Sequence, residues 1–434
     1  MEQQEWTIMV YLAGDNNLSV DMAYAMEQIK EVAGAETENV NLFVYYDGFA
    51  ATIPTLYCDF SDSEKPRQVR SFKVTDKLYP VEENPNENAA DYRSIANFVD
   101  WCVNRAEHIK DGQVVRGRRA DRYALIFSGH SMGFQDIGLF KDENTGKSMS
   151  MNQLHAVLER LTKSEDKLIA EGGDQNPDLS DSARTKPVIG QKLDILGFDS
   201  CVMGMLEVGN QFDSVAETMI ASEGSVPSAG WTYAKILGNL AHHSKSLPVE
   251  EIAANFVSEF VRSQDSYTIG GVSVDMAAWD FSHLPQLNAA FEDLADALLE
   301  CFSDKESTIY KQMARVLLQV HWKCQTYMYD QNVDLGDMCE LLLEECSSLQ
   351  REVGESINPQ ITSLEAACHK VLLELQNTVI LSGFSGGGYQ YSNGISLFWP
   401  WSLAGYSVSK ENYEGLDFVK GTAGGRKWNE FLYK

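Results

Sequence analysis

The chain has 434 residues, of which 44% are hydrophobic and 10% aromatic, so it is long enough for one large core or two domains. Its formal net charge of −28 argues against nucleic acid or an anionic membrane as a partner, since both attract Lys and Arg. Eight cysteines are scattered without CxxC pairs, and the amino terminus lacks the basic and apolar segments of a secretory signal. No apolar run has membrane-spanning length. We therefore expect a cytoplasmic location, unless the sequence is a trimmed form of a secreted protein.

The first part of the chain alternates apolar strands with helices. Buried strands are predicted at 6–12, 40–46 and 123–128, and short edge strands at 55–59 and 68–74. Helices are predicted at 20–32, 89–109 and 151–161, with a hairpin-like turn segment at 138–146. This alternation is typical of an α/β layered domain with a mostly parallel sheet.

The segment 163–190 breaks this pattern because it is polar and turn-forming with little periodicity. A long segment of that kind inside a compact domain is usually functional or mobile, so we treat it as a flexible linker. A buried strand (193–198), a helix from 202 and a strand (215–221) follow. The region after about 240 is mostly helical. Its helices are predicted at 248–262, 284–302, 305–321, 332–348 and 360–377, with strands at 268–274 and 394–400.

Cys201 lies between the strand 193–198 and the helix predicted from 202. A helix amino terminus stabilises an anion and lowers the pKa of a thiol, so the position favours a nucleophilic cysteine. Asp199 lies two residues earlier, and both side chains point to one face if the strand continues. A lone cysteine after a strand is more often a buried packing residue, so a second observation is needed.

That second observation is His130, which follows the strand 123–128 at its carboxyl end. In an open parallel sheet, catalytic groups gather at the carboxyl ends of the strands. A histidine and a cysteine delivered there form a pair of general base and nucleophile.

Ser131 offers an alternative, because residues 129–133 (Gly-His-Ser-Met-Gly) match the G-x-S-x-G elbow of α/β-hydrolases. In that interpretation Ser131 is the nucleophile of a serine hydrolase. The elbow requires a helix to begin at once, whereas the residues that follow have turn chemistry, and no HGGG-type motif lies upstream.

Two further polar segments were weighed as ligand sites. Asp142, Asn144 and Gly146 partly match a calcium loop, but their spacing does not fit and a hairpin turn explains them better. Residues 15–17 (Asp-Asn-Asn) follow the first strand and are placed to touch a ligand, although helix capping explains them about as well.

Several of these segments together resemble the clostripain-type cysteine peptidases, which belong to the caspase-like clan with gingipains and legumain. The resemblance is carried by Thr-Ile-Met-Val-Tyr-Leu-Ala-Gly-Asp-Asn-Asn-Leu before residue 19, the strand that ends at His130, and Asp-Ser-Cys-Val-Met-Gly-Met-Leu-Glu from Asp199. Residues 223–233 and 394–400 also fit. It implies a caspase-like three-layer α/β sandwich with a mostly parallel central sheet over 1–240, and a mainly helical carboxyl-terminal region over 241–434 with strands returning near 379–400.

The resemblance also implies roles for site residues. His130 would be the general base or acid, and Cys201 the nucleophile that forms an acyl-thioester. The backbone N–H groups of Ser131 and Cys201 would hold the oxyanion, although the family usually has Gly at the position of Ser131. Asp199 matches the acidic residue of the S1 pocket that selects Arg or Lys at P1, since a carboxylate pairs with guanidinium bidentately. Glu223 and Trp231 are expected in the pocket wall.

The expected protein is therefore a cysteine endopeptidase that cleaves peptides or proteins after Arg or Lys, with no nucleic acid or membrane partner. The family resemblance also implies self-cleavage within 163–190, for which Arg184 and Lys186 are the main candidates and Lys163 and Lys167 the weaker ones. The chemistry needs no cofactor, but the resemblance makes calcium an expectation. A third possibility is a catalytically inactive member that acts as a binding or regulatory module, if Ser131 spoils the site.

Overall fold

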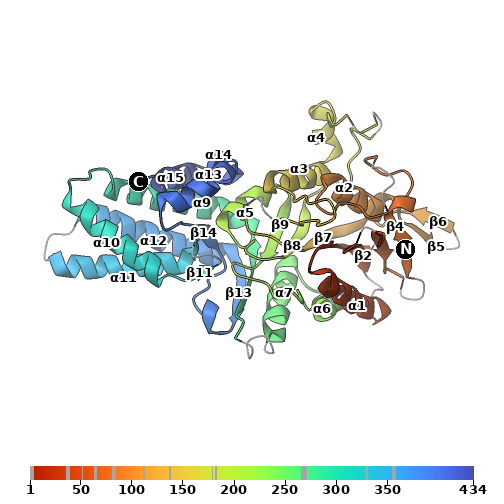
Figure 1. Cartoon of the computed structure of the whole chain (residues 1–434), viewed down its shortest axis with the longest axis horizontal. Coiled ribbons are helices and arrows are strands. Elements are labelled where there is room, and N and C mark those ends of the chain that lie inside the picture. Colours follow the sequence, from red (N-terminus) through yellow and green to blue (C-terminus); the bar gives the residue numbers. More distant parts are fainter. Residues whose placement is uncertain are drawn as a thin grey trace.

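The computed structural model describes residues 4–35, 40–50, 52–62, 66–80, 85–110, 113–135, 138–177, 179–180, 183–264, 271–327, 331–353 and 358–434 (Figure 1). Its centre is a nine-stranded sheet with the order β13-β10-β9-β8-β7-β1-β2-β3-β4. The strands are β1 (Gln4–Gly14), β2 (Val40–Gly48), β3 (Leu56–Asp59), β4 (Arg67–Arg70), β7 (Ala120–Ser128), β8 (Leu193–Asp199), β9 (Ala216–Ala221), β10 (Val274–Asp280) and β13 (Val379–Ser385).

The five middle strands of this sheet, β2, β1, β7, β8 and β9, run parallel to one another. The pairs at both edges are antiparallel. Side chains of β1 alternate between the two faces: Ile8 and Val10 join one hydrophobic core, whereas Met9 and Tyr11 join the other. Both faces are therefore buried, as parallel sheets require, which explains the continuous apolar runs in the sequence.

Helices cover both faces of the sheet (Figure 1). The first face is packed by α1 (Ser19–Ala35), α6 (Tyr233–His243) and α7 (Val249–Ser263). The opposite face is packed by α2 (Tyr92–Asp100), α3 (Met151–Thr162) and α5 (Leu206–Phe212). The predicted three-layer α/β architecture with a mostly parallel central sheet is confirmed.

The carboxyl-terminal region forms a helical body beyond the β13 edge of the sheet, at the left of Figure 1. Its helices are α9 (Leu284–Cys301), α10 (Thr308–Lys323), α11 (Leu335–Val353), α12 (Pro359–Thr378), α13 (Leu403–Glu414), α14 (Asp417–Gly421) and α15 (Ala423–Phe431). A small sheet of β11 (Thr326–Tyr327), β12 (Asn332–Asp334) and β14 (Ser396–Phe398) accompanies them. The central sheet nevertheless continues past residue 240, because β10 and β13 extend it from β9.

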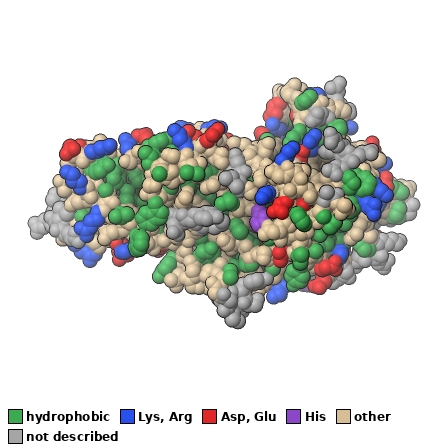
Figure 2. Space-filling view, in the orientation of Figure 1, with side chains coloured by type: hydrophobic (Ala, Val, Ile, Leu, Met, Phe, Trp, Pro, Cys, Tyr) green, Lys and Arg blue, Asp and Glu red, His purple; other side chains and the backbone are tan. Residues whose placement is uncertain are grey.

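Short elements complete the described chain. They are the helix α4 (Glu165–Ala170), the hairpin of β5 (Glu107–Lys110) and β6 (Gln113–Arg116), and short helical turns at Ser71–Lys73, Trp101–Arg105, Phe281–His283 and Gly387–Tyr389. Among the described residues, no helix is both long and apolar enough to cross a bilayer. Acidic and basic side chains are mixed over the face of the molecule that Figure 2 shows.

Several predicted elements differ from the structure, and two of them illustrate the reason. The helix expected at 89–109 ends its α-helical part at Asp100 and passes through a wider turn into β5, because residues 107–110 pair with β6. The strand expected at 268–274 lies partly on 265–270, outside the described residues, and the observed strand is β10. The charged residue Asp275 made β10 hard to recognise as a buried strand in the sequence. Its carboxylate can be buried because it accepts the backbone N–H groups of Glu223 and Gly224.

Candidate active site

The carboxyl ends of β7 and β8 bring the two predicted catalytic residues together. In the parallel ladder between these strands, Ser128 is paired with Asp199. His130 and Cys201 each follow two residues later, just past the ends of these strands. Backbones of neighbouring strands lie about 4.8 Å apart. Residues far apart in the sequence therefore meet at one edge of the sheet.

The ring of His130 is held by Asn17, which lies in the turn after β1. Nε2 of His130 is 2.6 Å from Oδ1 of Asn17. Because an amide oxygen only accepts, Nε2 carries the proton and Nδ1 is the basic nitrogen. Burial lowers the pKa of His130, while Glu143 raises it in part, so the imidazole is neutral at neutral pH. His130 is thus prepared to accept a proton.

The thiol of Cys201 is half-buried beneath the loop that follows β9. The N–H of Val226 donates to Sγ over 3.3 Å, and the carbonyl oxygen of Val226 is 3.7 Å from Sγ. Burial raises the pKa of the thiol, although the Val226 N–H lowers it in part. At neutral pH the side chain of Cys201 is therefore a thiol rather than a thiolate.

The helix predicted from residue 202 begins later than the sequence suggested. α5 starts at Leu206, five residues after Cys201, and Val202 has a left-handed backbone with φ of 60°. The helix dipole acts only within its first turn, so it does not reach Sγ. The prediction that a helix lowers the pKa of the Cys201 thiol is wrong, because the chain forms a turn after Cys201 and the helix α5 begins only at Leu206.

Ser131 forms a short hydrogen bond from its hydroxyl to the carbonyl oxygen of Cys201. Its side chain is buried, and the hydroxyl donates to a backbone carbonyl rather than to a histidine. Residues 131–135 form bridges and turns instead of the helix that a nucleophile elbow requires. Within the described chain, the backbone N–H groups of Ser131 and Cys201 donate to no protein acceptor, which is what an oxyanion hole requires.

Asp199 lies beneath this edge of the sheet with its side chain almost fully buried. Ser128 and Tyr233 both donate their hydroxyl groups to Oδ2 over 2.8 Å. Oδ1 has no hydrogen-bond partner among the described residues. Burial raises the pKa of Asp199 to about 6, although these hydrogen bonds lower it in part. The carboxylate is therefore mostly charged at neutral pH although it is enclosed by its neighbours.

Comparison with known proteins places this arrangement in a family. Residues 172–432 match the model of the clostripain family, Peptidase_C11. The chain belongs to the clostripain family. Members of this family are cysteine proteases that act on peptides, so the α/β-hydrolase alternative with Ser131 as nucleophile does not apply to this chain.

Individual relatives are distant but extend over nearly the whole chain. Clostripain from Hathewaya histolytica is 22% identical over 445 residues, which cover 92% of this chain and 75% of that protein. An inactive zymogen C11 protease from Parabacteroides distasonis has a TM-score of 0.59 at 17% identity, over 97% of this chain and 99% of its own. A secreted C11 cysteine protease from Bacteroides thetaiotaomicron, solved with an irreversible peptide inhibitor, has a TM-score of 0.57 at 17% identity, over 94% and 96%. These two structures share the fold.

In this clostripain-family chain, the side chains of Glu223 and Trp231 are both fully buried. Glu223 is fully buried and accepts the N–H of Gly394 over 2.8 Å, and its pKa is raised by burial and by Asp334. Trp231 is also fully buried, packs against Phe256, and faces the sheet at Gly197. Both side chains support the loop between β9 and α6 from inside.

The residues that sequence analysis missed come from this loop and from the turn after β1. Val226 covers Sγ of Cys201, Tyr233 binds Asp199, and Asn17 orients His130. The segment 15–17 had a signal as a possible ligand contact. Nothing in the sequence marks Val226, because an aliphatic residue that covers a thiol with its backbone has no motif.

The candidate self-cleavage residues differ in how tightly they are held. Arg184 is half-buried and donates from Nη1 to the carbonyl oxygen of Asp174, whereas Lys186 has an exposed side chain. Lys163 pairs with Glu159 and Glu171. Lys167 is exposed but belongs to helix α4.

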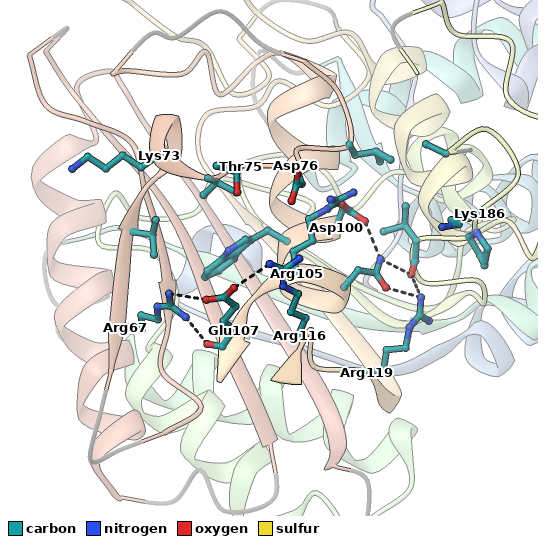
Figure 3. A pocket seen from close by; sticks show the side chains of 18 of the residues that line it. Arg67, Lys73, Thr75, Asp76, Asp100, Arg105, Glu107, Arg116, Arg119 and Lys186 are labelled. Carbon is teal, nitrogen blue, oxygen red and sulfur yellow. Dashed lines mark hydrogen bonds and ion pairs between the residues drawn. The ribbon is translucent and has the colours of Figure 1, made fainter. Parts of the chain in front are cut away.

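A pocket of about 760 Å³ lies where the segment 163–190 meets β4, β6 and the end of α2 (Figure 3). Its basic lining residues are Arg67, Lys73, Arg105, Arg116, Arg119 and Lys186. Arg105 is paired with Asp100, and Arg116 with Glu107, so part of this positive charge is neutralised. Neither His130 nor Cys201 lines this pocket, so the large cavity is separate from the candidate catalytic site.

Proposed function

We propose that this clostripain-family chain is an endopeptidase that cleaves after Arg or Lys, with Cys201 as nucleophile and His130 as general base. The observation that supports it most is the register of β7 and β8, which brings a neutral imidazole and a thiol to one sheet edge. Family membership supports cysteine peptidase chemistry, and peptides are the corresponding substrates.

In the proposed reaction, Nδ1 of His130 takes the proton from Sγ of Cys201 as Sγ attacks the carbonyl carbon of the scissile peptide bond. The oxygen that becomes negative is stabilised by the N–H groups of Ser131 and Cys201. The tetrahedral intermediate collapses, the C–N bond breaks, and the leaving amine receives the proton from His130. Water activated by His130 then hydrolyses the thioester and restores the thiol.

The preference for Arg or Lys is proposed to come from Asp199. Its open oxygen and its charge above a pKa of about 6 suit a guanidinium or ammonium group. The side chain is only 4% exposed, and a Cβ at Gly230 would lie 2.6 Å from Oδ2. Binding of a long cationic side chain therefore requires the loop around Gly230 and Val226 to move outward.

Self-cleavage is proposed at Lys186, ahead of Arg184, because its side chain is exposed and that of Arg184 is held. The carbonyl oxygen of Lys186 accepts a hydrogen bond from Arg160 over 3.2 Å, so the segment must open locally before it fits an active site.

The deciding experiment compares hydrolysis of Arg-, Lys- and Leu-aminomethylcoumarin peptides by the wild type, Cys201→Ala and Ser131→Ala. We expect turnover of the Arg and Lys peptides only, its complete loss in Cys201→Ala, and a partial loss in Ser131→Ala. Absence of turnover in a folded wild type, with calcium present, would support the inactive binding module instead.

The cytoplasmic location expected from the sequence is not supported. Two structural neighbours from Bacteroides thetaiotaomicron are described as secreted C11 cysteine proteases. The place of action of this chain is therefore best tested directly, by fractionating the producing cells and their medium and probing for the full chain.

A further inference from the structure

The loop that covers Cys201, residues 222–226, is held by a residue from the second half of the chain. The carboxylate of Asp275 in β10 accepts the backbone N–H groups of Glu223 and Gly224 over 2.7 and 2.8 Å. This carboxylate is buried, and each of its two oxygens accepts one of the two N–H groups. The beginning of this covering loop is therefore fixed to the edge of the central sheet.

The end of the covering loop carries the groups that surround the thiol. The N–H of Val226 donates to Sγ of Cys201 over 3.3 Å. Burial raises the pKa of the thiol, whereas hydrogen bonds from the Val226 N–H and from the side chain of Ser225 lower it in part. The carbonyl oxygen of Gly224 accepts the N–H of Val202, the residue after the thiol, over 2.9 Å. A shift of the covering loop would therefore change the surroundings of Sγ.

Tyr389 contacts the covering loop at two points. Its hydroxyl oxygen accepts the backbone N–H of Ser225 over 3.3 Å. Its ring lies so close to Gly224 that a Cβ on this glycine would be 2.4 Å from Cε2 of the ring. Burial raises the pKa of Tyr389, so its hydroxyl keeps its proton at neutral pH. The phenol thus anchors the loop one residue before the N–H that binds Sγ.

The short helical turn that ends at Tyr389 is itself anchored. The N–H of Gly388 donates to Oγ of Ser273 over 2.8 Å. Gly386 has a φ of 93°, and a Cβ at this residue would lie 2.6 Å from the same Oγ. The ring of Tyr327 packs against that of Tyr389 with a centroid distance of 5.2 Å. Glycines therefore let the turn approach the start of β10 closely, and this approach fixes the phenol ring.

We propose that Tyr389 is a positioning residue for the nucleophile Cys201. It fixes the covering loop at Ser225, and the loop places the hydrogen-bond donors of Ser225 and Val226 against Sγ. Tyr389 acts through the loop and touches no reacting atom. This inference rests on the proposed function, in which the thiol of Cys201 attacks the peptide bond. The chain after β13 thereby contributes to the reaction, although it supplies neither the nucleophile nor the base.

The test measures the Cys201 thiol itself, so it does not depend on peptidase activity. The rate of alkylation by iodoacetamide is followed by intact mass across neutral and alkaline pH, and its midpoint gives the pKa of the thiol. The other cysteines are buried, so one adduct is expected, and Cys201→Ala gives the background. Tyr389→Phe keeps the ring over Gly224. It also keeps Asp199 and Asp275, whose charges raise the pKa of the thiol.

In Tyr389→Phe we expect the pKa of Cys201 to rise by at least about half a unit, because the donors to Sγ lose their anchor. Gly224→Ala should also raise this pKa, because the new Cβ separates the loop from the phenol ring. Tyr327→Phe is the matched control. It removes a hydroxyl that bonds to Ser392 from a neighbouring ring, and it should leave the pKa of the thiol unchanged.

Peptide hydrolysis gives a second readout. Tyr389→Phe should lower kcat at least about fivefold and change KM less than about twofold, because the groups that bind substrate stay in place. A merely structural role would lower the urea midpoint and leave the pKa of the thiol in the folded protein unchanged. An unchanged or lower thiol pKa in Tyr389→Phe, or an equal rise in Tyr327→Phe, would overturn the proposal. A wild type that hydrolyses no peptide would contradict the proposed function alone, because alkylation still reports on the thiol.

Discussion

Replacement of Asp199 by Asn should raise the free energy of unfolding relative to that of the wild type, and this difference should grow as the pH rises. The same substitution should abolish cleavage after Arg and Lys. Burial moves the pKa of Asp199 from about 3.9 in the unfolded chain to about 6. The contribution of Asp199 to stability is therefore fully present below pH 3.9 and is lost as the pH rises through 6. The total loss is about 3 kcal/mol, since one pKa unit corresponds to about 1.4 kcal/mol.

The pH range that can be used is limited by the low isoelectric point of about 4.6. Between pH 5 and pH 8 the linkage relation gives a change of about 1.4 kcal/mol. We therefore expect the free energy of unfolding of Asp199→Asn, relative to wild type, to rise by that amount across this range. Loss of the acceptor for one of the two hydroxyl groups adds an offset that does not depend on pH and so cancels in the comparison.

Urea unfolding monitored by tryptophan fluorescence at pH 5, 6, 7 and 8 measures this difference. Tyr233→Phe is the matched control, because it removes one hydrogen bond from the carboxylate and keeps the charge. It should lose stability relative to wild type as the pH rises, which is the opposite slope. A flat difference for Asp199→Asn, or slopes of equal sign in the two variants, would refute the assignment of a buried charge at Asp199.

Three further outcomes are expected. Gly230→Ala should lower the free energy of unfolding by about 1–3 kcal/mol, because the φ of 68° at Gly230 disfavours a side chain. It should also reduce cleavage after Arg, because the new Cβ meets Asp199. Unchanged urea unfolding curves would contradict this prediction. Asn17→Ala should lower kcat at least about tenfold with little change in KM. Asn17→Asp should keep activity but move the acid limb of the pH–rate profile to higher pH, because a carboxylate raises the pKa of His130. Equal pH–rate profiles for Asn17→Asp and the wild type would exclude the positioning role of Asn17. Lys186→Gln should leave one intact chain by mass spectrometry under conditions in which the wild type is cut, and cutting at the same bond would reject Lys186.

The layers of the fold could be predicted from the sequence because each parallel strand is buried on both faces. Residues 6–12, 40–46, 123–128 and 193–198 are apolar runs too short for helices, and each coincides with a central strand. The long amphipathic helices after residue 284 were also predicted close to their observed bounds. The strand at Val274–Asp280 was misplaced, since the acceptors and donors that allow Asp275 inside it are distant in sequence.

The position of His130 and Cys201 at the carboxyl ends of strands could be predicted, because functional groups gather there in a parallel sheet. That the two strands are neighbours is seen only in the structure. The electrostatics of the two residues could not be predicted. The thiol pKa depends on where α5 begins and on the covering backbone of Val226, and neither is visible in the local sequence.

The central position of the β7–β8 ladder has a consequence for a chain that is nicked between these strands. A break at Lys186 would yield a light piece with the imidazole and a heavy piece with the sulfur, yet the backbone bonds from Ala124–Ile195 to Ser128–Asp199 cross the break. Both fragments bury apolar side chains in the same two cores. Such a nicked molecule should run as two bands under denaturing conditions and as a single species in its native state, with the reaction carried out across a non-covalent seam.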